Sequence, residues 1–227
     1  MKNALLFLRR AIPAIFMFAL AAFAFGERAC AENAPKAVLS DENKKILQDI
    51  EKYFNGIKSI KSDFSQVSAT GAFAEGKINL LKPDRMRLEY APPYPVEIIA
   101  DGHYLIFHDK KLEQVTYLDL DDNPASIILK ENFSFKDSDL TVEDISRSPG
   151  FIEVTVFKTE QPAAGKITLV FRDRPLALKQ WQITDAQKTK TLVSLNQAEF
   201  NVPVDEAQFV FKDPYKSRPG DRPRRNR

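Results

Sequence analysis

Residues 80–95 read LLKPDRMRLEYAPPYP, and this stretch carries the main signal for the fold. Met86, Leu88 and Tyr90 alternate with charged side chains after Asp84. A period of two places the apolar side chains on one face of a β-strand and the charged ones on the other. The stretch therefore predicts a half-buried strand, whose apolar face covers either a closed core or a surface kept available for a ligand.

The same period of two runs from residue 63 almost to the end of the chain, interrupted by short turns rich in Gly, Pro and Asp. Closely spaced strands with short turns indicate an antiparallel meander. The predicted strands cover residues 63–69, 73–81, 85–90, 96–101, 104–108, 111–117, 141–146, 151–158, 166–172, 177–183, 189–197 and 209–211. An open sheet of about eleven strands tends to curl. We therefore expect a mainly β (α+β) fold, an unclosed antiparallel β-barrel that encloses a core or a cavity.

Two helices are expected to lie across this half-barrel as a lid. Ser40 is a candidate N-cap, followed by acidic residues in the first turn. An amphipathic stripe then follows at helical spacing, with Ile46, Leu47, Ile50, Tyr53, Phe54, Ile57 and Ile60. Residues 123–130 predict a short second helix, because Asn123 and Pro124 suit the N-cap and the first helical position.

The N-terminus has the features of a secretory signal peptide, with basic residues before an uncharged run and the small residues Ala29 and Ala31 at a cleavage site. We expect cleavage after Ala31, which removes Cys30 and leaves a chain with no thiol. The alternatives are a membrane anchor, although the run of about 16 residues is short, and lipidation of Cys30. We therefore expect an exported protein.

The remaining chain divides into a single domain, residues 32–215, and a basic tail, residues 216–227, with too few apolar residues to fold. Residues 1–31 contain four basic residues and one acidic residue, so their removal changes the net charge from +2 to −1. Of the remaining chain, the tail has a net charge of +5, whereas the domain, residues 32–215, has a net charge of −6. This distribution does not favour a nucleic-acid binder.

The chain contains no recognisable catalytic or metal motif, so we expect neither an enzyme nor a cofactor. His103 and His108 are the only histidines, and they are interpreted as surface or edge residues. Trp181 is interpreted as a core residue, with lining of a ligand cavity as the alternative. Strict alternation places Leu178 and Trp181 on opposite faces of their strand.

Several segments in order resemble the LolA-type periplasmic lipoprotein carriers. They are IKSIKSDFSQ, GAFAEGKINLLKPDRMRLEY, PVEIIADGHYLIFHD, DNPASIIL, GKITLVFRDRPLALKQWQITD and FVFKDP, between about residues 40 and 214. The resemblance implies a half-barrel whose hydrophobic interior shields the acyl chains of lipoproteins. It also implies partners: an inner-membrane ABC-type releasing complex, and an outer-membrane acceptor or the outer membrane itself. The expected location is the periplasm of a Gram-negative bacterium, and we expect a monomer.

The resemblance and the predicted strand faces together suggest the residues that contact lipid. The candidates for the cavity and lid are Ile50, Phe54, Ile57, Phe64, Met86, Leu88, Tyr90, Ile98, Ile127, Leu169 and Trp181. A basic residue before the proline of the quoted stretch contacts the lid in the family, and Lys82 occupies this position. Lysine lacks the planar five-donor guanidinium of arginine, so Lys82 is expected to be a weaker lid latch.

Two other functions remain open within the same fold. One is a sensor that binds mislocalised lipoproteins and regulates an anti-sigma factor, which normally carries a further C-terminal domain. The other is a membrane-anchored acceptor of the LolB type, which requires lipidated Cys30.

Overall fold

The computed structural model describes residues 40–136 and 139–216, so the predicted signal peptide, Cys30 and most of the basic tail lie outside the described residues. The described elements are α1 (Asp41–Gly56), β1 (Ser59–Ser68), β2 (Phe73–Leu81), β3 (Arg85–Tyr90), β4 (Val96–Asp101), β5 (Tyr104–Asp109), β6 (Gln114–Asp119), η2 (Pro124–Leu129), β7 (Leu140–Ser148), β8 (Phe151–Lys158), η3 (Pro162–Ala164), β9 (Gly165–Arg172), β10 (Ala177–Asp185), β11 (Lys190–Phe200) and η4 (Glu206–Phe209). The η elements are 3₁₀-helices.

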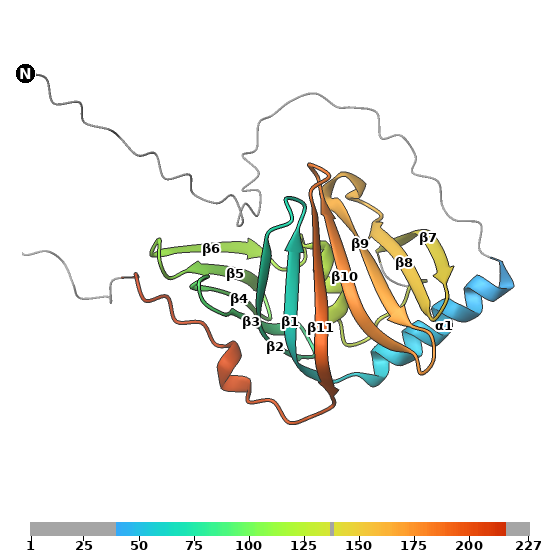
Figure 1. The fold of residues 1–227 in the computed structure, drawn as a ribbon, viewed down its shortest axis with the longest axis horizontal. Coiled ribbons are helices and arrows are strands. Elements are labelled where there is room, and N and C mark those ends of the chain that lie inside the picture. The colour runs from blue at the N-terminus through green and yellow to red at the C-terminus, as the bar shows by residue number, and fades with distance from the viewer. Residues whose placement is uncertain (1–39, 137–138, 217–227) are drawn as a thin grey trace, which may run out of the picture. The chain divides into compact units, whose positions relative to one another are not determined.

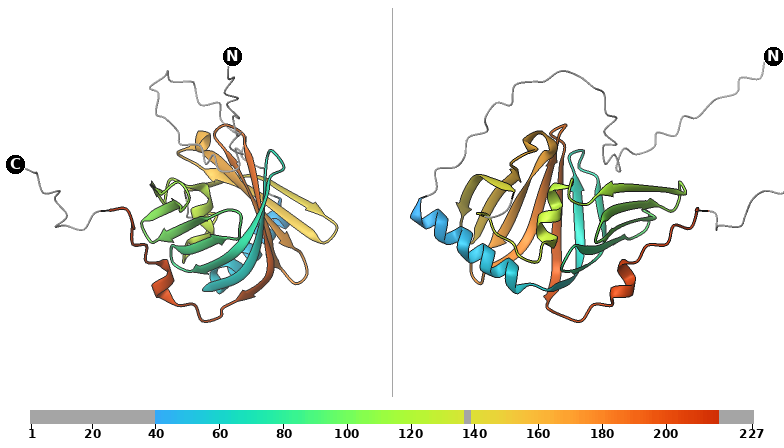
Figure 2. Two further views of the ribbon diagram at one scale, coloured as in Figure 1. Left: turned by 60° about the vertical axis from the view of Figure 1, so that its left-hand side comes forward. Right: turned by 180° about the vertical axis from the view of Figure 1, so that it is seen from behind.

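The strands form one antiparallel sheet in the order β6-β5-β4-β3-β2-β1-β11-β10-β9-β8-β7 (Figure 1). The two halves of the chain are joined where β1 pairs with β11. In the described part of the chain β6 and β7 do not pair with each other, so the sheet curls without closing (Figure 2). This arrangement confirms the predicted unclosed barrel.

Cross-strand register places most of the buried apolar side chains of the strands on one face, which we call the inner face, although Ile99 and Ile106 lie on the opposite face beside Arg87. Leu88 pairs with Ile78 of β2 and with Ile98 of β4, and all three are buried. In the other half, Trp181 pairs with Leu169 of β9 and Val193 of β11. The opposite, outer face carries the charged side chains of β3. The quoted stretch thus forms the half-buried strand that its pattern predicts.

Helix α1 covers part of the inner face (Figure 2). The Ser40 hydroxyl accepts a hydrogen bond from Asn43 N at 3.1 Å, which confirms the predicted N-cap. The buried residues of the helix are Ile46, Leu47, Ile50 and Phe54. The helix ends earlier than the apolar stripe suggests: Ile57 is its extended C-cap, and Ile60 lies in β1. Gly56 and the start of β1 at Ser59 limit the helix.

The second predicted helix is the 3₁₀-helix η2, and the following loop connects it to α1. Asn55 Nδ2 donates to Phe133 O at 2.9 Å, and Phe133 N donates to Asn55 Oδ1 at 2.8 Å. Phe135 N donates to Glu51 Oε1 at 2.6 Å. These bonds hold the loop beside the last turns of α1.

Two local predictions are wrong. Residues 209–211 do not form a strand: Phe209 ends the 3₁₀-helix η4, which Asp205 caps, and none of the described strands pairs with this segment. Leu178 and Trp181 lie on the same face, since a register shift between Leu178 and Gln180 inserts one residue into β10. The observed bounds of β6, Gln114–Asp119, also differ by two or three residues from the predicted strand at residues 111–117.

None of the helices in the described parts of the chain combines the length and the apolar character that crossing a membrane requires.

Candidate functional site

The candidate site is the inner face of the sheet together with the elements that cover it. The predicted cavity and lid residues are all buried, with exposed fractions between 0 and 8%. They are Ile50, Phe54, Ile57, Phe64, Met86, Leu88, Tyr90, Ile98, Ile127, Leu169 and Trp181. The sheet residues among them share the inner face, because each is in register with inner-face neighbours. Ile50, Phe54 and Ile57 come from α1 and its C-cap, and Ile127 comes from η2.

The inner face is divided into two regions. In the region of β1 to β4, the Phe64 ring lies edge-on to the Tyr90 ring, with centroids 5.1 Å apart. Tyr90 OH donates to Gln66 Oε1 at 2.7 Å, which satisfies the one polar atom of this ring. Burial raises the pKa of the Tyr90 phenol, so it stays neutral. The region of β8 to β11 carries Leu169 and Trp181 and lies under α1.

An aromatic cluster joins α1 to the sheet. The Phe54 ring lies 5.6 Å from Phe171 of β9 and 5.2 Å from Phe133 of the loop after η2. Tyr53 lies 6.0 Å from Phe171, and its hydroxyl accepts a hydrogen bond from Leu178 N at 2.9 Å. Sequence reasoning selected Phe54 but missed Phe133 and Phe171. Phe171 could have been found, because it alternates with Leu169 in the same predicted strand.

The turn between β2 and β3, residues 82–84, contacts both lid elements. Lys82 Nζ donates to Phe54 O at 2.7 Å and lies 5.3 Å from the centroid of the Phe54 ring. The C-terminus of a helix favours a cation, and α1 has no basic residue in its own last turn. Asp84 N donates to Leu129 O of η2 at 3.0 Å. The structure therefore places Lys82 and Phe54 in contact.

The pH dependence of stability should reveal the buried position of Lys82. Burial lowers the pKa of its amine from 10.5 to about 8. Between these values the unfolded chain holds a proton that the folded chain has lost, so the contribution of Lys82 to stability increases with pH. We expect the free energy of unfolding of the wild type, relative to Lys82→Met, to rise between about pH 7.5 and about pH 10. Urea unfolding of both proteins at the two pH values measures this difference in the free energy of unfolding. A difference that stays constant or falls as the pH rises would contradict the burial of the Lys82 amine.

A groove of about 1070 Å³ follows one side of α1. Its apolar part includes Ile46, Ile57 and Phe200, and basic side chains such as Lys52 and Arg172 border it. On this side the helix does not pack tightly against the sheet. The buried apolar side chains of α1 are supplemented by the aromatic cluster, the hydrogen bonds to the loop after η2 and the contact with Lys82. Near the two ends of the helix, Glu42 forms an ion pair with Arg147 of β7, and Asn201 Nδ2 donates to Gly56 O at 3.0 Å.

The sequence of this chain matches a known protein family. A sequence model of the family described as outer membrane lipoprotein carrier protein LolA matches residues 55–212, well over half of the chain. The chain belongs to the LolA family.

Several proteins similar to this LolA-family chain are known by name. An outer-membrane lipoprotein carrier protein from Halorhodospira halophila is 31% identical over 74% of this chain and 82% of its own. One from Leptothrix cholodnii is 28% identical over 71% of this chain and 79% of its own. An uncharacterized protein from Rickettsia prowazekii is 29% identical, but the match spans only 57% of that protein and 54% of this chain.

The solved structures that match this chain have low sequence identity to it. A LolA superfamily protein from Nitrosomonas europaea has a TM-score of 0.40 and 10% identity, over 73% of this chain and 97% of the other. A DUF1329 family protein from Desulfovibrio piger has a TM-score of 0.48 and 6% identity, over 74% of this chain and 96% of the other.

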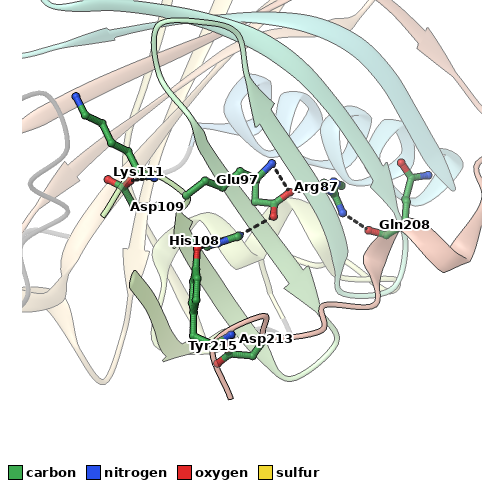
Figure 3. Close-up of polar contacts among 9 residues, drawn as sticks. Arg87, Glu97, His108, Asp109, Lys111, Gln208, Asp213 and Tyr215 are labelled. Atoms are coloured by element: carbon green, nitrogen blue, oxygen red, sulfur yellow. Dashed lines mark hydrogen bonds and ion pairs between the residues drawn. The ribbon is translucent and has the colours of Figure 1, made fainter. Parts of the chain in front are cut away.

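The outer face of the LolA-family sheet carries a polar network that the sequence did not suggest (Figure 3). Glu97 accepts from Arg87 Nη2 at 2.5 Å, and its other oxygen lies 2.8 Å from His108 Nδ1. His108 Nε2 lies 3.1 Å from Tyr215 OH. His108 is 5% exposed, so its interpretation as a surface residue is wrong. His103 is exposed, as expected.

This network attaches the C-terminal segment, residues 205–216, to the outer face. Arg87 Nη1 donates to Gln208 O at 3.0 Å, and the side chain of Phe209 is buried. Burial acts to raise the pKa of Glu97, but the hydrogen bond from His108 and the charges of Arg87 and Lys110 outweigh it and leave this pKa below its ordinary value. Arg87 thus points away from α1, as the alternation around Met86 predicts.

No group of three or more potential metal-binding side chains (His, Cys, Asp or Glu) occurs in the described segments.

Proposed function

We propose that this protein carries lipoproteins across the periplasm, holding their acyl chains against the inner face of the sheet. The observation that carries the proposal is an extensive apolar inner face that the amphipathic helix α1 covers. Membership of the LolA family and the names of the curated relatives support the same function. We infer that the described form is the closed one, in which α1 covers the acyl site.

The free energy gained by burying α1 is similar to that gained by burying an acyl chain, which supports replacement of α1 by cargo on the inner face. Burial of the four apolar side chains of α1 is worth about 6–12 kcal/mol relative to water. An acyl chain of about 16 carbons is worth about 13 kcal/mol relative to water. One chain can therefore replace the helix on the inner face. Because the bilayer shelters the chain equally well, extraction requires energy from an inner-membrane ABC-type releasing complex.

The proposed route begins with export by a signal peptide cleaved after Ala31 and ends at an outer-membrane acceptor or the outer membrane itself. A carrier is preferred to a sensor of mislocalised lipoproteins, or to an acceptor anchored through Cys30, because the named relatives are carriers. In this proposal the predicted cavity residues line the acyl site, and Lys82 is the latch between the β2–β3 turn and α1.

A release measurement with acylated and unacylated cargo tests the carrier function. Spheroplasts that contain a labelled lipoprotein are incubated with the purified protein, and the label in the soluble complex is measured. We expect release of the acylated lipoprotein and none of a version that lacks the lipid-modified cysteine. Equal capture of both forms, or of neither, would contradict the proposal.

Variants on the two faces locate the acyl site. Ile98→Asp places a carboxylate on the inner face and is expected to reduce release, whereas Val67→Asp changes a 39%-exposed residue of β1 whose side chain lies on the outer face. Circular dichroism establishes that each variant folds. If Ile98→Asp is unfolded, competition between a free fatty acid and the acylated lipoprotein for the wild-type protein gives the same answer. The Lys82→Arg variant in this assay tests the latch, and unchanged release kinetics would count against it.

A further inference from the structure

The two edge strands of the described sheet differ in how they are protected from pairing with another chain (Figure 1). Strand β7 has a register shift between Val142 and Asp144, and it carries Glu143 and Arg147, which both form ion pairs. Bulges and charges are the usual devices that prevent an edge strand from pairing. Strand β7 is therefore protected.

Strand β6 has fewer of these devices: it has no register shift, and its one charged residue is Asp119 at its end. Its register with β5 is regular from Tyr104–Asp119 to Asp109–Gln114, and no Pro, Lys or Arg lies between Gln114 and Asp119. Leu118 is 36% exposed, whereas Tyr117, which is 37% exposed, contacts Asp213 and Lys216 of the C-terminal segment on the outer face. Within the described residues no strand pairs with the other side of β6. Its outer row of backbone donors and acceptors is therefore available for an added strand.

The charges that flank β6 indicate which strand suits this edge. Lys110 and Lys111 precede the strand, whereas Asp119 ends it and Asp122 follows. Lys111 and Asp122 are exposed, and neither forms an ion pair with another described residue. An antiparallel copy of the same strand brings its acidic end beside the basic end of the first. A parallel copy would place like charges together.

We propose that β6 is a self-association surface, at which two copies of this chain pair antiparallel. The two-fold axis stands perpendicular to the sheet, so the inner faces of both copies lie on the same side and the exposed Leu118 side chains approach each other. Such an interface uses the same patch on both copies and closes at a dimer. It is independent of the cargo site.

The interface is small, so the association is weak. A strand of six residues spans about 20 Å. A stable complex usually buries roughly 1,600 Å², which one added strand pair does not provide. The dimer therefore forms at high protein concentration, and the expected monomer describes dilute protein.

Charge reversal in trans tests the proposal. Sedimentation velocity is measured from about 10 μM to about 1 mM for the exported protein, for Lys111→Asp and for Asp122→Lys. We expect the wild type to dimerise as the concentration rises and each variant to associate about tenfold more weakly, because like charges then face each other twice. An equimolar mixture of the two variants restores both opposite-charge contacts and should dimerise like the wild type.

A matched pair of edge variants provides the control. Thr116→Lys places a charge on β6 and should abolish dimerisation, whereas Ser146→Lys places the same charge on β7 and should have no effect. Far-UV circular dichroism checks that all variants fold. The proposal would be overturned by a wild type that stays monomeric at all concentrations, or by charge-reversal variants that dimerise like the wild type. It would also be overturned if the mixture of the two variants did not dimerise, or if the lysine substitutions on β6 and β7 changed dimerisation equally.

Discussion

Replacing Phe54 by alanine is expected to lower the free energy of unfolding by about 3–5 kcal/mol. Phe54 is 2% exposed, and its ring contacts Phe171, Phe133 and Tyr53. Alanine would leave a cavity at the point where α1, the sheet and the loop after η2 meet. Urea unfolding measures the loss.

The matched control is Phe73→Ala, because Phe73 is 54% exposed. Removal of a largely exposed ring should change stability by less than about 1 kcal/mol. If the lid proposal is right, Phe54→Ala should also bind a fluorescent acyl probe faster than the wild type, since α1 loses its main contact. A loss of less than about 1 kcal/mol for Phe54→Ala would show that the aromatic cluster does not hold the helix.

Gly76→Ala is expected to destabilise the protein by about 3 kcal/mol or more, or to prevent its folding. A Cβ atom at this position of β2 would lie 2.1 Å from Glu89 O and 2.8 Å from the Phe64 ring. The carbonyl belongs to the backbone of β3, so it cannot move without separating the two strands. The Phe64 ring also fills the space that glycine leaves beside Tyr90.

Gly56→Ala is the matched control for the change from glycine to alanine. A Cβ atom at Gly56 meets nothing within 4 Å, and this residue ends α1. Alanine there should leave stability unchanged or raise it by about 0.5–1 kcal/mol. Thermal unfolding compares the two variants, and similar melting temperatures would contradict the steric argument at Gly76.

The inner face could be read from the sequence because strand alternation is local. Met86, Leu88 and Tyr90 differ from their neighbours in polarity, and the period of two directs all three to the same side. The contact between Lys82 and α1 could not be derived from alternation. Lys82 and Phe54 are 28 positions apart, so local periodicity does not indicate that they meet. Only the resemblance to the LolA family predicted that Lys82 contacts the lid.

Other features depended on partners that alternation does not describe. Leu178 faces the same side of the sheet as Trp181 because β10 has one extra residue between Leu178 and Gln180 where it pairs with β9. This bulge depends on the pairing of the two strands, which the alternation within β10 does not describe. His108 is buried because Tyr215, 107 residues away, covers it and Glu97 gives it a partner. The apolar residues near position 209 were interpreted as a strand, although Phe209 ends η4, which Asp205 caps.

The sequence by itself determined the antiparallel meander, the start of α1 at Ser40 and the side of each regular strand that is apolar. These properties follow from local periodicity and from capping, which need no distant partner. The tertiary structure alone decided that the β2–β3 turn meets both lid elements, that the outer face binds the C-terminal segment, and that β6 is left as the less protected edge. Each of these depends on which distant groups satisfy a backbone or charged group, and only the folded chain brings those groups together.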